Sequence, residues 1–216
     1  DGLLNLVTSE LNSDDVVTAP APGNGGGLHV SGMNGTQVNV VASSVMNNEA
    51  ALEGGGLWNQ SGSEMNVFSS TVTGNEAFGD GPANGGGGIF NSGGRLNVGF
   101  ASMISNNMAS GTSGSGGGIL STADSVIITE SFVNDNRAKR AGGGIEIIDG
   151  VLNMTDSDMS DNRVVLNANP GNGGGLHVSG MAGTVVNIIN TTVTSNFAAT
   201  EGGGLWNQSG SFMNVS

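Results

Sequence analysis

The sequence of 216 residues contains no cysteine and no tyrosine, only four prolines, and five basic residues against 18 acidic ones. The lack of cysteine excludes disulfide scaffolds, thiolate metal sites and a cysteine nucleophile. The net charge of −13 opposes binding to nucleic-acid phosphates and to anionic lipid surfaces. Since no apolar run is long enough to cross a bilayer as a helix, we also expect no membrane span.

Glycine is abundant, with 40 residues, but its placement is not that of collagen, which requires glycine at every third position and much more proline. The glycines follow a repeat of about 30 residues instead. A triple glycine followed by leucine or isoleucine occurs seven times, and the apolar residues are Leu28, Leu57, Ile89, Ile119, Ile145, Leu176 and Leu205. Each triplet therefore marks the same place in successive structural units.

Three short strand-like pieces accompany each repeat. The first follows the triplet, the second is an apolar-Asn-apolar triad such as Val38-Asn39-Val40, and the third ends near an asparagine. They alternate apolar and polar residues, which is typical of β-strands. Because one such unit cannot bury its apolar face alone, the units must stack. The sequence predicts an all-β fold, a right-handed parallel β-helix of about seven coils of ~30 residues each.

In such a stack, a residue that recurs at one place in every coil forms a ladder. We expect a ladder of stacked amides at a turn between strands, formed by Asn48, Asn75, Asn107, Asn136, Asn162 and Asn196. The glycine triplets are predicted to form a corner that requires positive φ or close backbone approach. Loops of variable length, such as residues 78–84 and 109–115, should protrude on one side.

A longer repeat is superimposed on the shorter one. Residues 1–68 align without a gap on residues 149–216, an offset of 148 residues or five coils, and the strings GNGGGLHVSGM and EGGGLWNQSGS occur in both copies. We expect residues 1–216 to form a single β-helix domain. Because open strand ends need cover, we further expect it to be part of a longer array, or to have its ends covered by identical neighbouring chains.

The succession GGGI/L, a GG or SG turn, L-x-V and S-x-x-x-x-N-x-A resembles the repeat of right-handed parallel β-helix surface proteins of bacteria. It is similar in particular to repeats of the polymorphic outer-membrane proteins and of large secreted adhesins. The resemblance covers the whole chain. It implies an extracellular or cell-surface location, a structural or adhesive role as a rigid stalk or filament, and identical chains or surface glycans as partners.

The residue after each apolar corner position is expected to point outward. These residues are His29, Trp58, Phe90, Leu120, Glu146, His177 and Trp206. Two interpretations remain open. The side chains form an exposed strip that stacks on sugar rings or on another solenoid, or a long loop folds over them.

Pectin-cleaving enzymes share the β-helix, so a polysaccharide-binding or polysaccharide-cleaving function is the second hypothesis. It requires clustered carboxylates near a basic residue. The best candidate group stacks two acids and two arginines in neighbouring coils, with two further basic residues close by: Asp135, Asp161, Arg137, Arg163, Lys139 and Arg140. We favour the alternative, a solvated turn of mixed charge, because the other copy of the second coil has Ser13, Asp14 and Asp15 instead.

We therefore expect no enzymatic activity and no cofactor. The segment TDSDMSD contains Asp156, Asp158 and Asp161, whose alternation invites a calcium hypothesis. It lacks an EF-hand loop and a glycine-rich calcium repeat. Loosely bound Ca²⁺ on an acidic surface is the metal interaction that the composition favours, and a specific metal site is left open.

Overall fold

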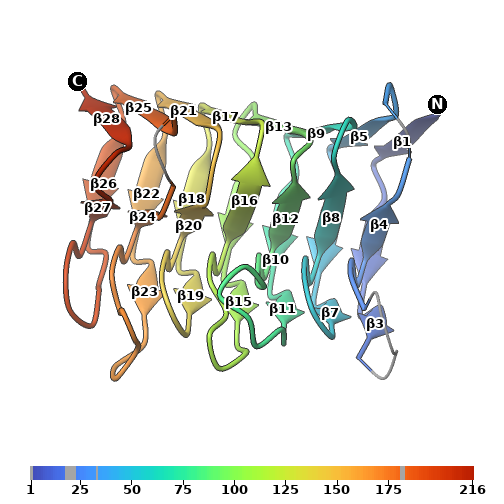
Figure 1. Cartoon of the computed structure of the whole chain (residues 1–216). Helices are drawn as coiled ribbons and strands as arrows, with labels where there is room; N and C mark the ends of the chain where they lie inside the picture. The colour runs from blue at the N-terminus through green and yellow to red at the C-terminus, as the bar shows by residue number, and fades with distance from the viewer. Residues whose placement is uncertain (1, 18–22, 33, 181–182) are drawn as a thin grey trace.

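The protein is a stack of coils built from four parallel β-sheets, in a computed structural model that describes residues 2–17, 23–32, 34–180 and 183–216 (Figure 1). The predicted all-β parallel β-helix of about seven coils is confirmed, and the described residues contain no helix. Consequently no helix in these ranges is long and apolar enough to cross a membrane. The first and last strands lie at opposite ends of the stack (Figure 1).

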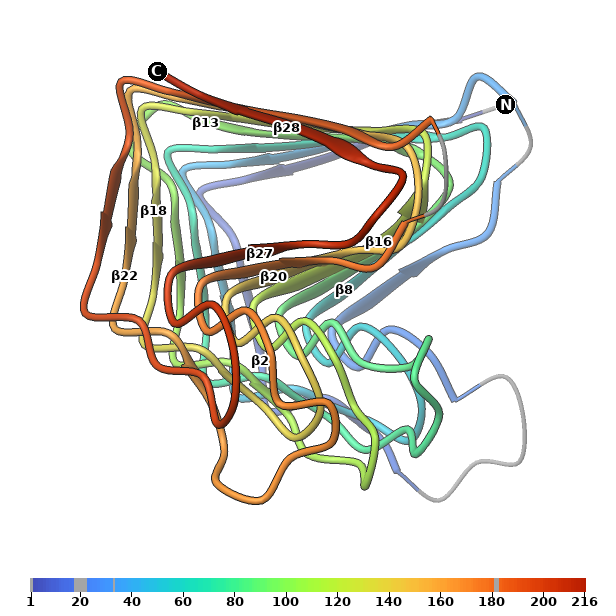
Figure 2. The same cartoon turned by 60° about the vertical axis from the view of Figure 1, so that its left-hand side comes forward.

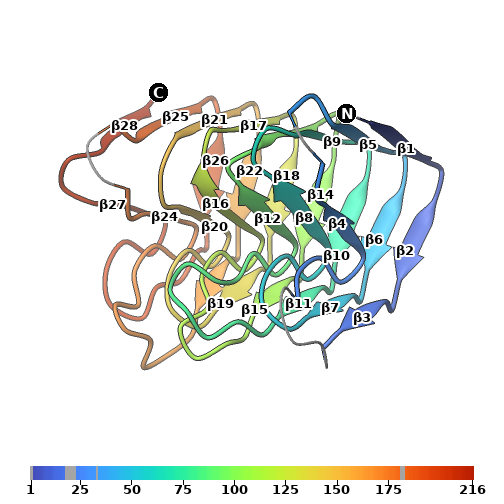
Figure 3. The same ribbon diagram turned by 45° about the vertical axis from the view of Figure 1, so that its right-hand side comes forward.

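The chain passes through four sheets in the same order in each of the first six coils, and we number these sheets 1 to 4 (Figure 3). The seventh coil has strands in sheets 1, 2 and 4. Sheet 1 contains β1 (Leu3–Val7), β5 (Gln37–Val41), β9 (Glu64–Phe68), β13 (Arg95–Gly99), β17 (Ser125–Thr129), β21 (Val151–Thr155), β25 (Val185–Ile189) and β28 (Phe212–Val215). Sheet 2 contains β2 (Glu10–Asn12), β6 (Ser44–Met46), β10 (Thr71–Thr73), β14 (Met103–Ser105), β18 (Phe132–Asn134), β22 (Asp158–Ser160) and β26 (Thr192–Thr194).

The remaining strands complete the coil. Sheet 3 contains β3 (Asp15–Val16), β7 (Glu49–Ala50), β11 (Glu76–Ala77), β15 (Met108–Ala109), β19 (Arg137–Ala138) and β23 (Arg163–Val164). Sheet 4 contains β4 (Leu28–Val30), β8 (Leu57–Gln60), β12 (Ile89–Ser92), β16 (Ile119–Ala123), β20 (Ile145–Ile147), β24 (Leu176–Val178) and β27 (Leu205–Asn207).

The third piece of the predicted repeat is two strands, in sheets 2 and 3, and not one. The residue that precedes the ladder asparagine has positive φ, for example 54° at Asn106 and 55° at Asp135, so the chain turns sharply there. A second turn with positive φ separates sheets 1 and 2, for example at Ala42 and Ser69. These left-handed residues give the coil its corners, because regular β-structure cannot change direction within one residue.

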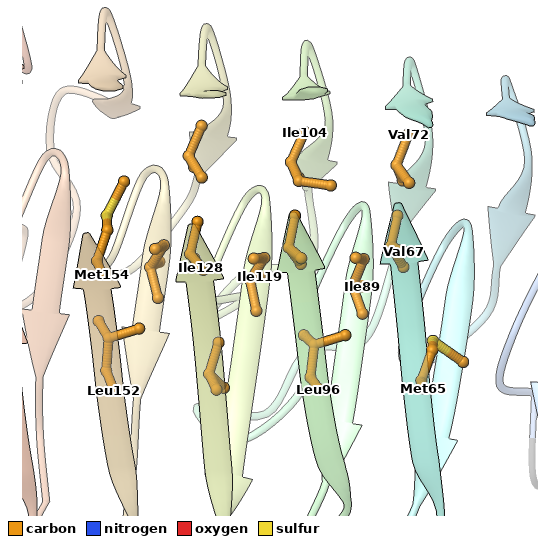
Figure 4. Close-up of a cluster of buried hydrophobic side chains, with 14 of the residues drawn as sticks. Met65, Val67, Val72, Ile89, Leu96, Ile104, Ile119, Ile128, Leu152 and Met154 are labelled. Carbon is orange, nitrogen blue, oxygen red and sulfur yellow. The ribbon is translucent and has the colours of Figure 1, made fainter. Parts of the chain in front are cut away.

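Sheets 1, 2 and 4 enclose the hydrophobic core (Figure 2). Leu96, Ile104 and Ile119 point into it from these three sheets and are fully buried (Figure 4). The parallel register places like residues above one another, so Met65 lies directly beside Leu96 in the neighbouring coil. Each coil therefore covers the apolar side chains of the previous one, and the core continues along the stack.

The glycine triplets form the corner that leads into sheet 4, and each of the three positions excludes a side chain for its own reason. The first glycine has φ between 60° and 68° in all seven triplets. In the triplet of residues 116–118, a Cβ on Gly117 would overlap the carbonyl oxygens of Arg137 and Gly143. A Cβ on Gly118 would lie 2.8 Å from the carbonyl oxygen of Gly144 and 3.0 Å from Cγ of Asn136. The predicted corner with positive φ and close backbone approach is confirmed.

The substitution Gly117→Ala tests this packing. We expect it to destabilise the protein by about 3 kcal/mol or more, because backbone atoms of two coils must separate to admit one methyl group. The measurement is chemical unfolding followed by circular dichroism. Gly99→Ala is the matched control, since a Cβ there meets the ring carbons of Phe68 at an ordinary 3.5 Å. Equal stability of the two variants would contradict the packing argument.

Candidate functional site

The asparagines at the turn between sheets 2 and 3 form a continuous hydrogen-bonded ladder. In one rung, Nδ2 of Asn107 donates to Oδ1 of Asn136 at 3.0 Å and to the carbonyl oxygen of Val72 at 3.0 Å. Its Oδ1 accepts from the backbone N–H and from Nδ2 of Asn75, at 3.1 Å and 2.9 Å. The same amide-to-amide bond links Asn48, Asn75, Asn107, Asn136, Asn162 and Asn196 in succession.

The amides in the middle of the ladder have no free capacity for a ligand. Asn107 is fully buried and makes four hydrogen bonds, two as donor and two as acceptor, so its polar atoms are satisfied within the stack. In the first coil the backbone N–H of Asp14 donates to Oδ1 of Asn48 at 2.9 Å, which continues the pattern with a different residue. The ladder is therefore a structural device that holds the turn of one coil to the next.

A second ladder of hydroxyl groups, which the sequence reasoning missed, occupies the corner between sheets 1 and 2. The backbone N–H of Ser43 donates to Oγ of Ser70 at 3.0 Å, and that of Ser70 donates to Oγ of Ser102 at 3.1 Å. Ser131, Ser157 and Thr191 form a second run of the same kind further along the stack. A signal was present, because in most coils the hydroxyl residue comes four positions after the asparagine of the apolar-Asn-apolar triad.

The outer face of sheet 4 is covered, so the expectation of an exposed strip is wrong for its middle positions. Trp58 is 9% exposed, and Phe90, Leu120, Glu146 and His177 are buried more fully. At the ends of this row, His29 and Trp206 are half-buried. The segments that return from sheet 3 to sheet 4 fold beneath this face (Figure 2). This burial agrees with the second interpretation of the row, cover by loops.

The aromatic rings of this row stack on one another in neighbouring coils, and the covering segments anchor them. The ring centroids of His29 and Trp58 are 4.3 Å apart, and Nε1 of Trp58 donates to Oε2 of Glu53 at 3.1 Å. Both contacts recur 148 residues later. His177 and Trp206 stack at 4.5 Å, and Trp206 donates to Glu201 at 3.1 Å. The five-coil repeat is thus maintained in side-chain contacts as well as in sequence.

The covering segments also contact one another. Nδ2 of Asn84 donates to Oε1 of Glu53 at 2.7 Å, which joins two of these segments. The backbone N–H of Thr112 donates to Asp80 at 2.7 Å. This bond and the Thr112 hydroxyl lower the pKa of Asp80 from its ordinary value, because both stabilise the carboxylate.

Glu146 is the centre of a buried polar cluster within this row. Its Oε2 lies 2.8 Å from Nδ1 of His177, and its Oε1 accepts from the hydroxyl of Ser179 at 2.6 Å. Arg140 approaches the same Oε1 at 3.7 Å and donates to Ser115 at 3.1 Å. Nε2 of His177 is buried without a hydrogen-bond partner among the described residues. The sequence analysis named Glu146, His177 and Arg140 separately. Glu146 and His177 meet as register partners in sheet 4, and Arg140 lies in the segment that leads from β19 to β20.

This cluster does not have the geometry of nucleophilic catalysis. The carboxylate lies between the histidine and the serine, whereas an activated serine needs a base within reach of its own hydroxyl. The carboxylate of Glu146 and the ring of His177 are buried, and Ser179 is partly exposed. We interpret the cluster as compensation for a carboxylate buried in the covered face.

The charged turn that was the candidate catalytic group lies on the surface. Asp135 and Asp161 are exposed and occupy equivalent left-handed positions, both with φ of 55°. Arg137 and Arg163 are register partners in sheet 3, as expected from the repeat. The guanidinium of Arg163 lies over the ring of Phe197, 4.7 Å from its centroid. Within the described ranges, neither aspartate forms an ion pair with an arginine.

A recess elsewhere on the surface combines carboxylates with a basic residue. The Arg95 recess, named for its arginine, has a volume of about 330 Å³ and is lined by Glu64, Arg95 and Asp124 together with polar residues of the corner between sheets 4 and 1. Nδ2 of Asn97 donates to Oε1 of Glu64 at 3.4 Å. The sequence reasoning missed this group, because its members come from three coils and carry no motif.

No carboxylate cluster for a metal ion is present in the part of the chain that the structure describes. No group of three or more histidine, aspartate or glutamate side chains lies close enough to hold one. The side chains of the TDSDMSD segment are engaged separately, since Asp156 accepts from Asn190 and Asp158 from Ser160, each at 2.5 Å. Loose calcium binding stays a prediction.

Comparison with known proteins gives no relative: no family model, no curated protein and no solved structure matches the chain.

Paired substitutions test the role of the Glu146 cluster. Glu146→Leu should destabilise the protein by about 3 kcal/mol, because it leaves buried polar groups of His177 and Ser179 without their partner. Adding His177→Phe should recover much of the loss, since the row then continues the apolar rungs of Phe90 and Leu120. Denaturant unfolding of both variants measures this. A double variant that is less stable than Glu146→Leu would contradict the interpretation.

Proposed function

We propose that the chain is a structural or adhesive repeat segment of a rigid cell-surface stalk or filament. The observation that carries the proposal is the asparagine ladder, in which the side-chain amides of one turn are used for coil-to-coil hydrogen bonds. The hydroxyl ladder does the same at another corner. Residues placed in this way supply length and stiffness to the stack.

Two further features support a stacked, elongated assembly. The five-coil repeat preserves the ring stack and its anchoring glutamate in both copies, as expected when coils follow one another in a longer array. At the usual strand spacing, five coils extend a solenoid by roughly 24 Å. The resemblance to repeats of bacterial surface proteins supports the extracellular location.

Labelling and imaging of the producing cells test this proposal. Antibodies raised against the chain should label intact cells as strongly as permeabilised ones, and negatively stained surface extracts should contain thin rods that bind the antibody. A cytoplasmic marker protein, labelled only after permeabilisation, is the control. Labelling that requires permeabilisation, or compact antibody-bound particles without rods, would refute the proposal.

The second candidate function, binding of acidic polysaccharide, is favoured by the Arg95 recess. Arg95 is exposed and offers a guanidinium to a sugar carboxylate, while Glu64 and Asp124 offer acceptors to hydroxyl groups. The recess replaces the charged turn around Asp135 as the place where we propose this activity.

Titration with oligogalacturonate tests the second function. We expect Arg95→Ala to weaken binding about tenfold, as is usual for loss of a charged hydrogen bond, and Arg137→Ala on sheet 3 to leave it unchanged. If unsaturated sugar products form during the titration, the protein also cleaves the oligosaccharide. If the unmodified protein binds no acidic oligosaccharide in calorimetry, the second function fails and the structural proposal is unaffected.

A further inference from the structure

One place on the outer surface departs from the repeat in three ways at once. It is a recess of about 280 Å³ on sheet 1, at the corner with sheet 2, and its lining includes Phe68, Gly99, Phe100, Ile127 and Glu130. We call it the aromatic recess. It adjoins the hydroxyl ladder at this corner, and its lining includes Asn97, which donates to Glu64 of the Arg95 recess. The inference drawn from it does not rest on the structural function.

The first departure is Gly99, whose register partner in sheet 1 is Phe68. The corresponding outward positions in other coils carry larger side chains, such as Val41 and Ile189. The second departure is Ile127, which replaces the outward asparagine of the triad and is paired with Asn97. Bare backbone at Gly99 forms the hollow, and Ile127 gives it an apolar wall.

The third departure is an extra residue at the corner. Ser102 follows Asn97 by five positions, whereas Ser70 follows Asn66 by four. Phe100 and Ala101 consequently occupy two successive left-handed positions, with φ of 56° and 59°. Such strain in non-glycine residues persists where the surrounding structure compensates for it, and it is concentrated at functional sites.

The inserted residue places a second aromatic ring beside the hollow. The rings of Phe68 and Phe100 are perpendicular, with an interplanar angle of 89° and centroids 5.1 Å apart. Phe100 is 63% exposed, so its ring is accessible to a ligand. Two perpendicular rings form a corner in which a small ligand can contact aromatic surface on two sides.

The charge around the recess is negative. Glu130 lines it, and no lysine or arginine is among the lining residues. A neighbouring recess of about 350 Å³ shares Glu130 and adds Phe132, Asp156 and Asp158, again without a basic residue. With a net charge of −13 on the whole chain, this corner attracts cations and repels anions.

We propose that the aromatic recess is a binding site for a small organic cation that carries a methylated ammonium group. The apolar methyl groups suit the hollow above Gly99 and the wall at Ile127. The positive charge is attracted to the faces of the two phenylalanine rings and to the carboxylate of Glu130. An anionic or strongly hydrated ligand would gain neither interaction.

The probe is choline, titrated against the chain of 216 residues and followed by NMR. Its neutral isostere, 3,3-dimethylbutan-1-ol, has the same shape without the charge. We expect choline to shift the ring resonances of Phe68 and Phe100, and the isostere to bind about tenfold more weakly. Equal affinity for the two probes, or no choline binding to the unmodified chain, would overturn the proposal.

Substitutions locate the site. Glu130→Gln and Phe100→Leu should each weaken choline binding about fivefold. Gly99→Val should abolish it by filling the hollow, while the fold is retained, because valine already occupies the equivalent position 41. Glu49→Gln on sheet 3 and Phe212→Leu at the far end of sheet 1 are the matched controls. Undiminished binding to folded Gly99→Val would show that choline binds elsewhere and would overturn the assignment.

A sedimentation experiment distinguishes the sources of the cation. Vesicles of phosphatidylcholine should deplete the protein from solution if a lipid headgroup reaches the recess, and free choline should then compete. If free choline binds but the vesicles do not deplete the protein, the ligand is a soluble cation. Depletion that is the same for Gly99→Val would contradict a role of the recess in either case.

Discussion

Direct stacking of backbone on backbone, coil above coil, is the constraint on which the rest of this structure depends. Parallel strands hold each coil at the hydrogen-bonding distance of its neighbours, so every position is repeated about 4.8 Å further along the stack. Backbone hydrogen bonds between coils continue through the glycine corner, for example from the N–H of Gly117 to the carbonyl oxygen of Gly142 at 3.0 Å. The glycine triplets keep the coils in contact at one corner, where carbonyl oxygens of the next coil fill the space of a side chain. At two other corners, a side-chain amide or hydroxyl oxygen of the next coil accepts the hydrogen bond from a backbone N–H, as Asn75 does from Asn48 and Ser70 does from Ser43.

The same constraint explains which features the sequence predicted. Glycine at residues 116–118, apolar residues such as Leu96, and the amide of Asn107 are each required by local geometry in every coil, so they recur in register and are visible as a period. Fold class, core and asparagine turn followed from that period. The division of the third strand piece did not, because the left-handed residue at the turn is variously Asn106, Asp135 or Gly74 and has no fixed identity.

Features that depend on departures from the period could not be predicted in the same way. Alternation indicated correctly that Trp58 and Glu146 face away from the core, but the loops that cover them vary in length and sequence. The pairing of Glu146 with His177 follows from adjacent rungs, yet nothing in the repeat requires a charge there. The aromatic recess arises from Gly99, Ile127 and one inserted residue near Phe100, and these departures are informative only after the regular pattern is known. Positions that follow the repeat therefore explain the rigidity of the stack, and departures from the repeat are the candidates for a binding function.

Site-specific hydrogen exchange tests the central claim, that the amide ladder joins the coils. The backbone amides of Asn75, Asn107 and Asn136 point at side-chain oxygens of the next coil and belong to no strand. If the ladder holds the turns together, NMR-detected exchange of these amides will be as slow as that of strand amides in sheet 1, such as Val98. Exchange as fast as that of an exposed loop residue such as Leu166 would contradict the account.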